Sequence, residues 1–153
     1  MPIIASLDCN LQLYLLPDKD MQNLLYALIQ SVHNLLAVLI VGVGAYGLFF
    51  ALNPTKRALA ALQSIAWALQ GVTGGAFGLI TYHYFHQLPD IHGVAIAALL
   101  IKIACVVMGF AFATTYVLFG PQFSKVVDRI FWWPMFLFGV LALSSAAFLR
   151  WFS

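Results

Sequence analysis

The chain has 153 residues, of which 63% are hydrophobic and 8% charged, and its mean hydropathy is +0.96. An average soluble domain has about 25% charged residues, and a soluble fold with so few charges would expose large apolar patches. A soluble enzyme, a nucleic-acid-binding protein and a disordered chain are therefore poor interpretations, and the net charge of +2 is too small to imply a polyanionic partner. We expect an integral membrane protein in a lipid bilayer, with room for about four spans.

The chain begins with a mixed segment, residues 1–22, that we expect to lie outside the cytoplasm. It has no basic start, and Asp8 and Asn10 interrupt its apolar run, so it does not read as a cleaved signal peptide. Cys9 lies in this segment and Cys105 lies within a later apolar run, so we expect no disulfide.

Residues 23–153 are predicted to form an all-α integral membrane domain, an antiparallel four-helix bundle. Each of the three breaks between its apolar runs contains a proline, Pro54, Pro89 or Pro121, which cannot extend a helix. The runs between these breaks are long enough to cross a bilayer. They predict transmembrane helices at about residues 24–52, 58–87, 92–119 and 130–151.

The charged residues divide unevenly between the two ends of the predicted bundle. The end that holds the first and third breaks has one acid, Asp128, among its basic residues. The other end has two basic residues, Lys19 and Arg150, and four aspartates. By the positive-inside rule the first end is cytoplasmic, which places both termini outside, and we expect a bacterial inner membrane. The basic residues of the cytoplasmic end are Lys56, Arg57, Lys125 and Arg129.

Small residues recur at three- and four-residue spacing on three of the predicted helices. This pattern marks the faces on which membrane helices touch. The second span carries two overlapping G-x-x-x-G pairs within residues 71–78. The stripes of the first and third spans also include His33 and Lys102, so we expect both side chains to face the bundle interior.

His33 and Lys102 are predicted to lie in one layer of the bundle. Counted from the proline-marked ends of their spans at 1.5 Å per residue, they stand ~30 Å and ~27 Å from the cytoplasmic end. No predicted span contains an acid, so the counter-charge of Lys102 would be a haem propionate, a lipid phosphate, a quinone oxygen or a partner's carboxylate. His33 would be an axial ligand if the cofactor is haem. The alternative is a Lys102 that extends to the headgroups and a His33 bonded to Gln30 or Asn34.

A second candidate site lies between the second and third spans. His83 and His86 are one helical turn apart and can share a face. Asp90 and His92 follow after a turn, and three imidazoles with a carboxylate are a ligand set for copper or zinc. The alternative is an interfacial turn whose histidine and tyrosine side chains lie among the lipid headgroups.

Three short motifs carry a resemblance to known membrane proteins. His33 precedes Leu-Leu-Ala-Val-Leu-Ile-Val-Gly-Val-Gly, Lys102 lies within Leu-Leu-Ile-Lys-Ile, and the last helix closes on Phe-Leu-Arg-Trp. Over residues 25–152 the chain resembles the four-helix unit of CopD-like copper-resistance membrane proteins and HemJ-type haem-binding protoporphyrinogen oxidases. A His and a Lys are associated with haem b in the HemJ-type proteins, so the resemblance implies haem b at His33 and Lys102. In the copper-handling relatives, outer-face histidines such as His83, His86 and His92 would suit copper traffic.

The expected function is the binding of copper or haem b near the extracytoplasmic face, in copper handling or electron transfer. The alternative is a non-catalytic accessory subunit of a larger membrane complex, because the chain has no C-x-x-C, no glycine-rich phosphate loop and no catalytic pair. Partners beyond the bilayer would be membrane-complex subunits or further copies of the chain, and no nucleic acid. A channel or transporter acting alone is the least supported interpretation, because the spans show no inverted broken helices.

Overall fold

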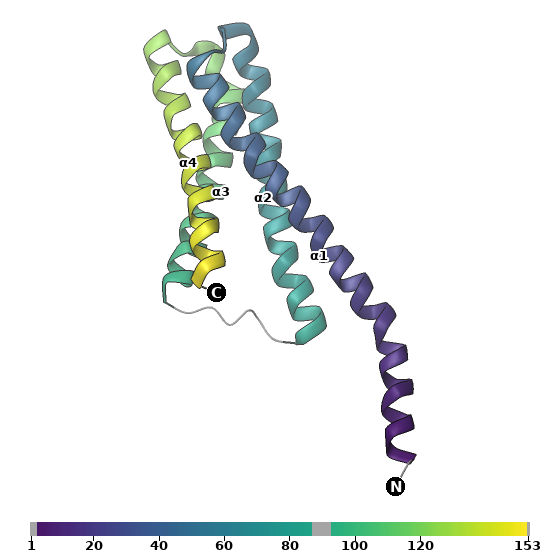
Figure 1. Cartoon of the computed structure of the whole chain (residues 1–153). Helices are drawn as coiled ribbons and strands as arrows, with labels where there is room; N and C mark the ends of the chain where they lie inside the picture. Colours follow the sequence, from purple (N-terminus) through teal and green to yellow (C-terminus); the bar gives the residue numbers. More distant parts are fainter. Residues whose placement is uncertain (1–2, 87–92, 153) are drawn as a thin grey trace.

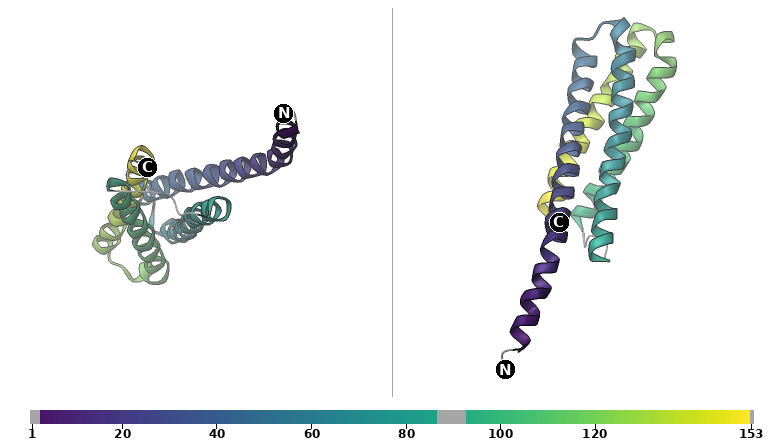
Figure 2. Two further views of the ribbon diagram at one scale, coloured as in Figure 1. Left: turned by 90° about the horizontal axis from the view of Figure 1, so that it is seen from below. Right: turned by 90° about the vertical axis from the view of Figure 1, so that its right-hand side faces the viewer.

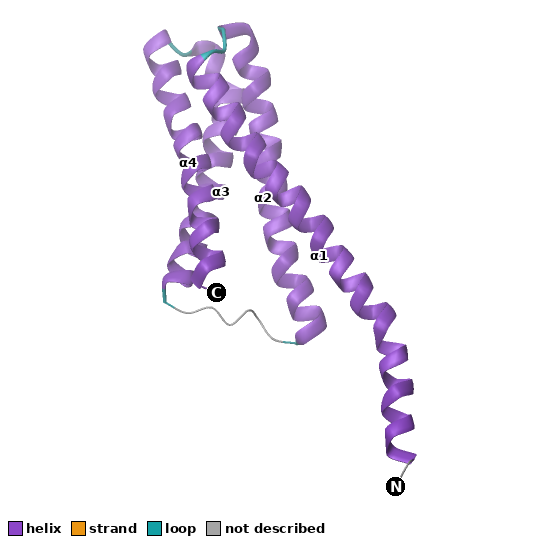
Figure 3. Ribbon diagram, in the orientation of Figure 1, coloured by secondary structure: helices purple, strands orange, loops and turns teal. Residues whose placement is uncertain are grey.

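The computed structural model of the chain describes residues 3–86 and 93–152. Over these residues it contains helices and short connections and no strand (Figure 3). Successive helices run in opposite directions and form a bundle (Figure 1). The predicted all-α, antiparallel four-helix bundle is confirmed. Its elements are α1 (Ile3–Phe49), α2 (Asn53–Phe85), α3 (Val94–Phe119), the 3-10 turn η1 (Gly120–Gln122) and α4 (Lys125–Phe152).

Three of the described helices are long and apolar enough to cross a membrane, over Lys19–Phe49, Val94–Gln122 and Lys125–Trp151. Their outward faces are apolar: the relative exposure is 70% for Leu35 and 61% for Leu100. Several buried side chains are polar, among them His33, Gln63 and Gln70. Apolar surface outside and polar groups inside are what a bilayer requires, because lipid offers polar groups no hydrogen bonds.

Helix α2 is not among these three, although the sequence predicts a span there. It packs against both α1 and α3, and its inward face carries two buried glutamines, Gln63 and Gln70. Gln63 Nε2 donates to the carbonyl oxygens of Ile40 and Met135, at 3.4 and 3.2 Å. The polar residues that lower the hydropathy of α2 therefore bond across the bundle to α1 and α4.

The helix ends follow the proline breaks more closely than the apolar runs. α2 begins at Asn53 with a proline in its first turn, as the sequence predicts. α4 begins at Lys125 rather than near residue 130, because its first turn is polar. The Val127 N–H donates to Ser124 Oγ at 3.4 Å and the Asp128 N–H to the Ser124 carbonyl at 2.8 Å, which starts the helix before the apolar run.

Helix α1 begins at Ile3 rather than near residue 24. The first part of this 47-residue helix extends away from the other three helices in every view (Figures 1 and 2). A helix satisfies its backbone hydrogen bonds internally, so it can continue beyond the region where it packs. The predicted span at about residues 24–52 therefore covers only the later part of a longer helix.

The centre of the bundle is built on two tryptophans that lie against glycines. Trp67 and Trp132 are fully buried, at 0% exposure. A Cβ on Gly109 would lie 2.3 Å from the Trp67 ring, and a Cβ on Gly47 would lie 2.0 Å from the Trp132 ring. Gly47 and Gly109 belong to the predicted stripes of the first and third spans, and both stripes face the interior.

The expectation for the glycines of α2 holds in part. A Cβ on Gly71 would lie 3.3 Å from the Val106 side chain of α3, and a Cβ on Gly74 would lie 3.5 Å from the His33 ring of α1. A Cβ on Gly75 or Gly78 would meet no atom within 4 Å.

The buried side of α2 runs through Ala60, Gln63, Trp67 and Gln70, which recur at three- and four-residue spacing, and it continues to Gly74. Exposure of the two amides and the indole to lipid would be costly. This cost favours the rotation of α2 about its axis that turns these side chains inward.

Candidate functional site

His33 and Lys102 meet inside the bundle, although α1 and α3 place them 69 residues apart in the chain. Lys102 Nζ lies 2.9 Å from His33 Nε2 and donates a hydrogen bond to it. His33 is only 5% exposed. Both side chains face the interior, as the small-residue stripes of their helices predict.

Two residues of α2 complete this polar centre. Thr73 Oγ1 lies 2.7 Å from His33 Nδ1 and also donates to the Leu69 carbonyl at 2.8 Å. Since the threonine proton goes to Leu69, Thr73 accepts from His33, and the imidazole proton is on Nδ1. The lone pair of His33 Nε2 then accepts from Lys102 and from Gln70 Nε2, the latter at 3.0 Å. His33 is therefore a neutral imidazole held in one tautomer.

A small cavity adjoins the centre. Its volume is about 30 Å³, and His33, Gln70 and Lys102 line it together with small residues of α1 and α4 such as Ala37 and Gly139. Gln70 Oε1 is buried and has no hydrogen-bond partner among the described residues. The cavity has the size of a water molecule or a single ion, and an unused acceptor lies beside it.

Gln70 and Thr73 were missed by the sequence analysis. The available signal was that each is a polar residue within an apolar run and that they lie three positions apart. The alternative for His33 is also wrong, because Gln30 Nε2 donates to Asn34 Oδ1 at 3.1 Å and His33 bonds to residues of α2 and α3 instead. Lys102 points to His33 and does not extend to the headgroups.

The second predicted site is placed only in part. His83 and His86 are exposed at the end of α2, where His86 takes a left-handed conformation with φ 51°. The His83 ring lies edge-on against Tyr84, with ring centroids 5.2 Å apart. Asp90 and His92 lie outside the described residues. Over residues 3–86 and 93–152, no group of three or more His, Cys, Asp or Glu side chains is placed to hold a metal ion.

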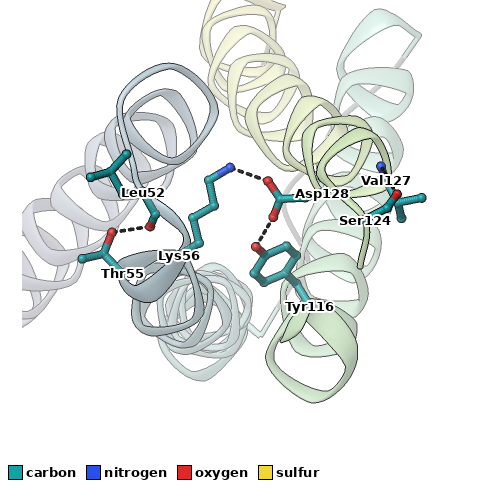
Figure 4. A network of polar contacts seen from close by, with 7 residues as sticks. All are labelled: Leu52, Thr55, Lys56, Tyr116, Ser124, Val127 and Asp128. Atoms are coloured by element: carbon teal, nitrogen blue, oxygen red, sulfur yellow. Dashed lines mark hydrogen bonds and ion pairs between the residues drawn. The ribbon is translucent and has the colours of Figure 1, made fainter. Parts of the chain in front are cut away.

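A second polar network lies at the opposite end of the bundle (Figure 4). Asp128 of α4 forms an ion pair with Lys56 of α2 and accepts a hydrogen bond from the Tyr116 hydroxyl of α3. Lys56 and Asp128 are each 8% exposed. The three helices are thus joined at the end where the sequence places most of the basic residues.

Comparison of the chain with family models, with curated proteins and with solved structures gave no significant match.

Proposed function

We propose that the chain is a small multi-pass membrane protein that binds a copper ion at the His33–Lys102 centre, in copper handling or electron transfer. The observation that carries this proposal is the 2.9 Å contact between Lys102 Nζ and His33 Nε2 inside an apolar bundle. Ionisable side chains in such a position are costly and mark functional sites.

The charge of Lys102 is not compensated by a described residue. Among the residues that the structure describes, the ion pair is that of Lys56 with Asp128, at the other end of the bundle, and Lys102 takes part in none. An uncompensated ammonium group in an apolar bundle is costly. Lys102 is therefore expected either to pair with an anion from outside the chain or to bind a metal as a neutral amine.

The donor atoms of the centre suit copper. His33 Nε2 lies 2.9 Å from Lys102 Nζ and 3.0 Å from the Gln70 amide. Two ligand atoms that bind the same ion, each at about 2.0 Å, lie about 3 Å from each other, which matches these separations. Rotation of the Gln70 amide exchanges its nitrogen for Oε1, the acceptor that has no partner. An imidazole, a neutral amine and an amide oxygen form an N,O ligand set of the kind that Cu(II) takes.

The same residues do not fit haem b. A cavity of about 30 Å³ holds an ion or a carboxylate group and no macrocycle. Of the two expected cofactors, the geometry therefore favours copper.

Metal analysis of variants tests the proposal. The full-length chain, purified from copper-replete cells, is expected to carry about one copper per chain and no Soret band. His33→Ala is expected to lose the copper, and His83→Ala, an exposed histidine of α2, is expected to retain it. Loss of copper only when His83 and His86 are replaced would assign it to the second predicted site, and a metal-free wild-type chain would overturn the proposal.

We further propose that the basic end of the bundle is cytoplasmic, which places the His33 centre in the extracytoplasmic half of a bacterial inner membrane. The support is the excess of Lys and Arg near the starts of α2 and α4, which lie at this end of the bundle. Alkaline phosphatase fused after residue 153 is expected to be active and green fluorescent protein at the same position dark. The reverse result would invert the orientation.

The outward glycine face of α2 favours a second candidate, an accessory subunit of a membrane complex or a homo-oligomer. A Cβ added at Gly75 or Gly78 would meet nothing within 4 Å, and small residues on an outward face allow close approach of another helix. Gly75→Leu is expected to reduce the apparent mass of the native assembly in mild detergent if this face is an interface. An unchanged mass would remove the reason for this candidate.

A further inference from the structure

We infer that the basic end of the bundle holds a binding site for a phosphate-bearing anion, separate from the His33 centre. A cavity of about 270 Å³ lies there between the start of α2, the end of α3 and the start of α4. It is roughly nine times larger than the cavity beside His33. Its volume is near the lower end of the range for small-ligand pockets, which suits a phosphate group with a short substituent.

The acid in this cavity is already neutralised. One oxygen of Asp128 pairs with the ammonium of Lys56, and the other accepts from the Tyr116 hydroxyl. Figure 4 shows these two contacts reaching Asp128 from α2 and α3. Because both carboxylate oxygens are engaged by buried partners, Asp128 stabilises the walls and adds little repulsion toward an entering anion.

The remaining charged groups in the lining are both positive. Arg57 lies on α2 and Lys125 begins α4, and the side chains of both are exposed at the cavity. Arg57 Nε donates to the Val117 carbonyl at 3.1 Å, which fixes the guanidinium beside α3. Its two NH₂ groups make no hydrogen bond to the described residues, so they remain available to a phosphate in the forked geometry that arginine favours.

The start of α4 strengthens this field. Lys125 opens the helix, and the first backbone N–H groups of a helix carry a partial positive charge. Two cationic side chains, one from α2 and one from α4, therefore line a cavity that adjoins the N-terminus of α4. Oxyanions with two or three acceptor oxygens, above all phosphates, match this arrangement.

Two sources supply such a group, an anionic lipid headgroup and a soluble phosphate ester. The cavity lies at the end of α3 and the start of α4. Both helices are long and apolar enough to cross a membrane. This position is at headgroup level, and it favours the lipid as the source.

Binding measurements on the full-length chain in detergent test the inference. The probes are dioctanoyl phosphatidylglycerol and inorganic phosphate, each titrated by calorimetry. Arg57→Gln and Lys125→Gln are each expected to weaken binding about tenfold. Arg129→Gln is the matched control, because Arg129 is an exposed cation at the same end that does not line the cavity, and a change below about twofold is expected there.

The outcomes separate the two sources and the contrary result. Tighter binding of the lipid than of phosphate assigns the site to a headgroup, and equal binding assigns it to a soluble phosphate ester. If Arg129→Gln weakens binding as much as Arg57→Gln, the attraction is a general surface charge and the site does not exist. Absence of binding of both probes to the wild-type chain would also overturn the inference. None of these results depends on the metal content of the His33 centre.

Discussion

Thr73 Oγ1 lies 2.7 Å from His33 Nδ1, and this contact fixes which nitrogen of the imidazole faces Lys102. The threonine gives its own proton to a carbonyl of its helix, so it accepts from His33. The basic nitrogen of His33 therefore points into the bundle interior, towards two donors. Such an outer partner, which orients an imidazole, is the usual support of a metal-binding histidine.

Thr73→Val is expected to release His33 from its tautomer. Valine has nearly the same shape and offers no acceptor, so a buried N–H loses its partner at a cost of about 1–3 kcal/mol in the free energy of unfolding. Copper content is expected to fall, since the imidazole is no longer held in one orientation.

The measurement is the ¹⁵N chemical shifts of the His33 ring together with thermal unfolding. Thr73→Ser is the matched control, because it keeps the hydroxyl and is expected to preserve both the tautomer and the copper. Unchanged ring shifts in Thr73→Val would show that Thr73 does not orient His33.

Lys102→Met is expected to abolish copper binding without a loss of stability. A methionine fills a similar volume and removes a buried charge that no described acid compensates, and replacement of buried charges by apolar groups is often neutral or stabilising. We expect the melting temperature to stay constant or rise by a few degrees, while the copper content falls to background.

The control is Lys125→Met, which makes the same substitution at an exposed position. It is expected to leave the copper content unchanged. A Lys102→Met chain that unfolds more readily and keeps its copper would contradict a functional role for Lys102 and indicate a structural one.

The sequence predicts the helices well because helix formation depends on local patterns. Proline fixes the breaks between the spans, and small residues mark the inward faces of α1 and α3. His33 and Lys102 could be paired from sequence because counting along two straight helices gives a common depth. These inferences require only the rise of a helix and the position of its ends.

The partners on α2 could not be predicted, because they depend on how that helix is turned about its axis. Its glycines mark the inward face only in part, because Gly74 lies beside His33, whereas a Cβ on Gly75 or Gly78 would meet nothing within 4 Å. The ion pair of Lys56 with Asp128 joins residues 72 positions apart and depends on where α4 starts, which the apolar pattern placed too late. Contacts of this kind follow from tertiary packing, and the spacing of residues along one helix does not identify the partner on another.

Gly47→Ala and Gly109→Ala are expected to destabilise the bundle. The added Cβ would lie 2.0 Å from the Trp132 ring and 2.3 Å from the Trp67 ring, and both indoles are fully buried. Overpacking of this kind costs about 1–3 kcal/mol. Gly75→Ala is the matched control, since its Cβ meets nothing within 4 Å and alanine is favoured over glycine in a helix by about 1 kcal/mol. Thermal unfolding in one detergent ranks the three variants, and equal loss in all three would show that the indoles do not rest on these glycines.

Asp128→Asn is expected to cost more stability than any surface charge substitution. It leaves the Lys56 ammonium, which is 8% exposed, without its anionic partner, and breaking a buried ion pair costs about 3–5 kcal/mol. Combining Asp128→Asn with Lys56→Met removes the unpaired charge as well and keeps an acceptor for the Tyr116 hydroxyl, so the double variant is expected to recover most of the loss. A double-mutant cycle by chemical unfolding measures the coupling between the two residues. Because the pair is buried, the coupling is expected to change little between low and high salt. A coupling near zero, or one that salt removes, would mean that Lys56 and Asp128 act as separate surface charges.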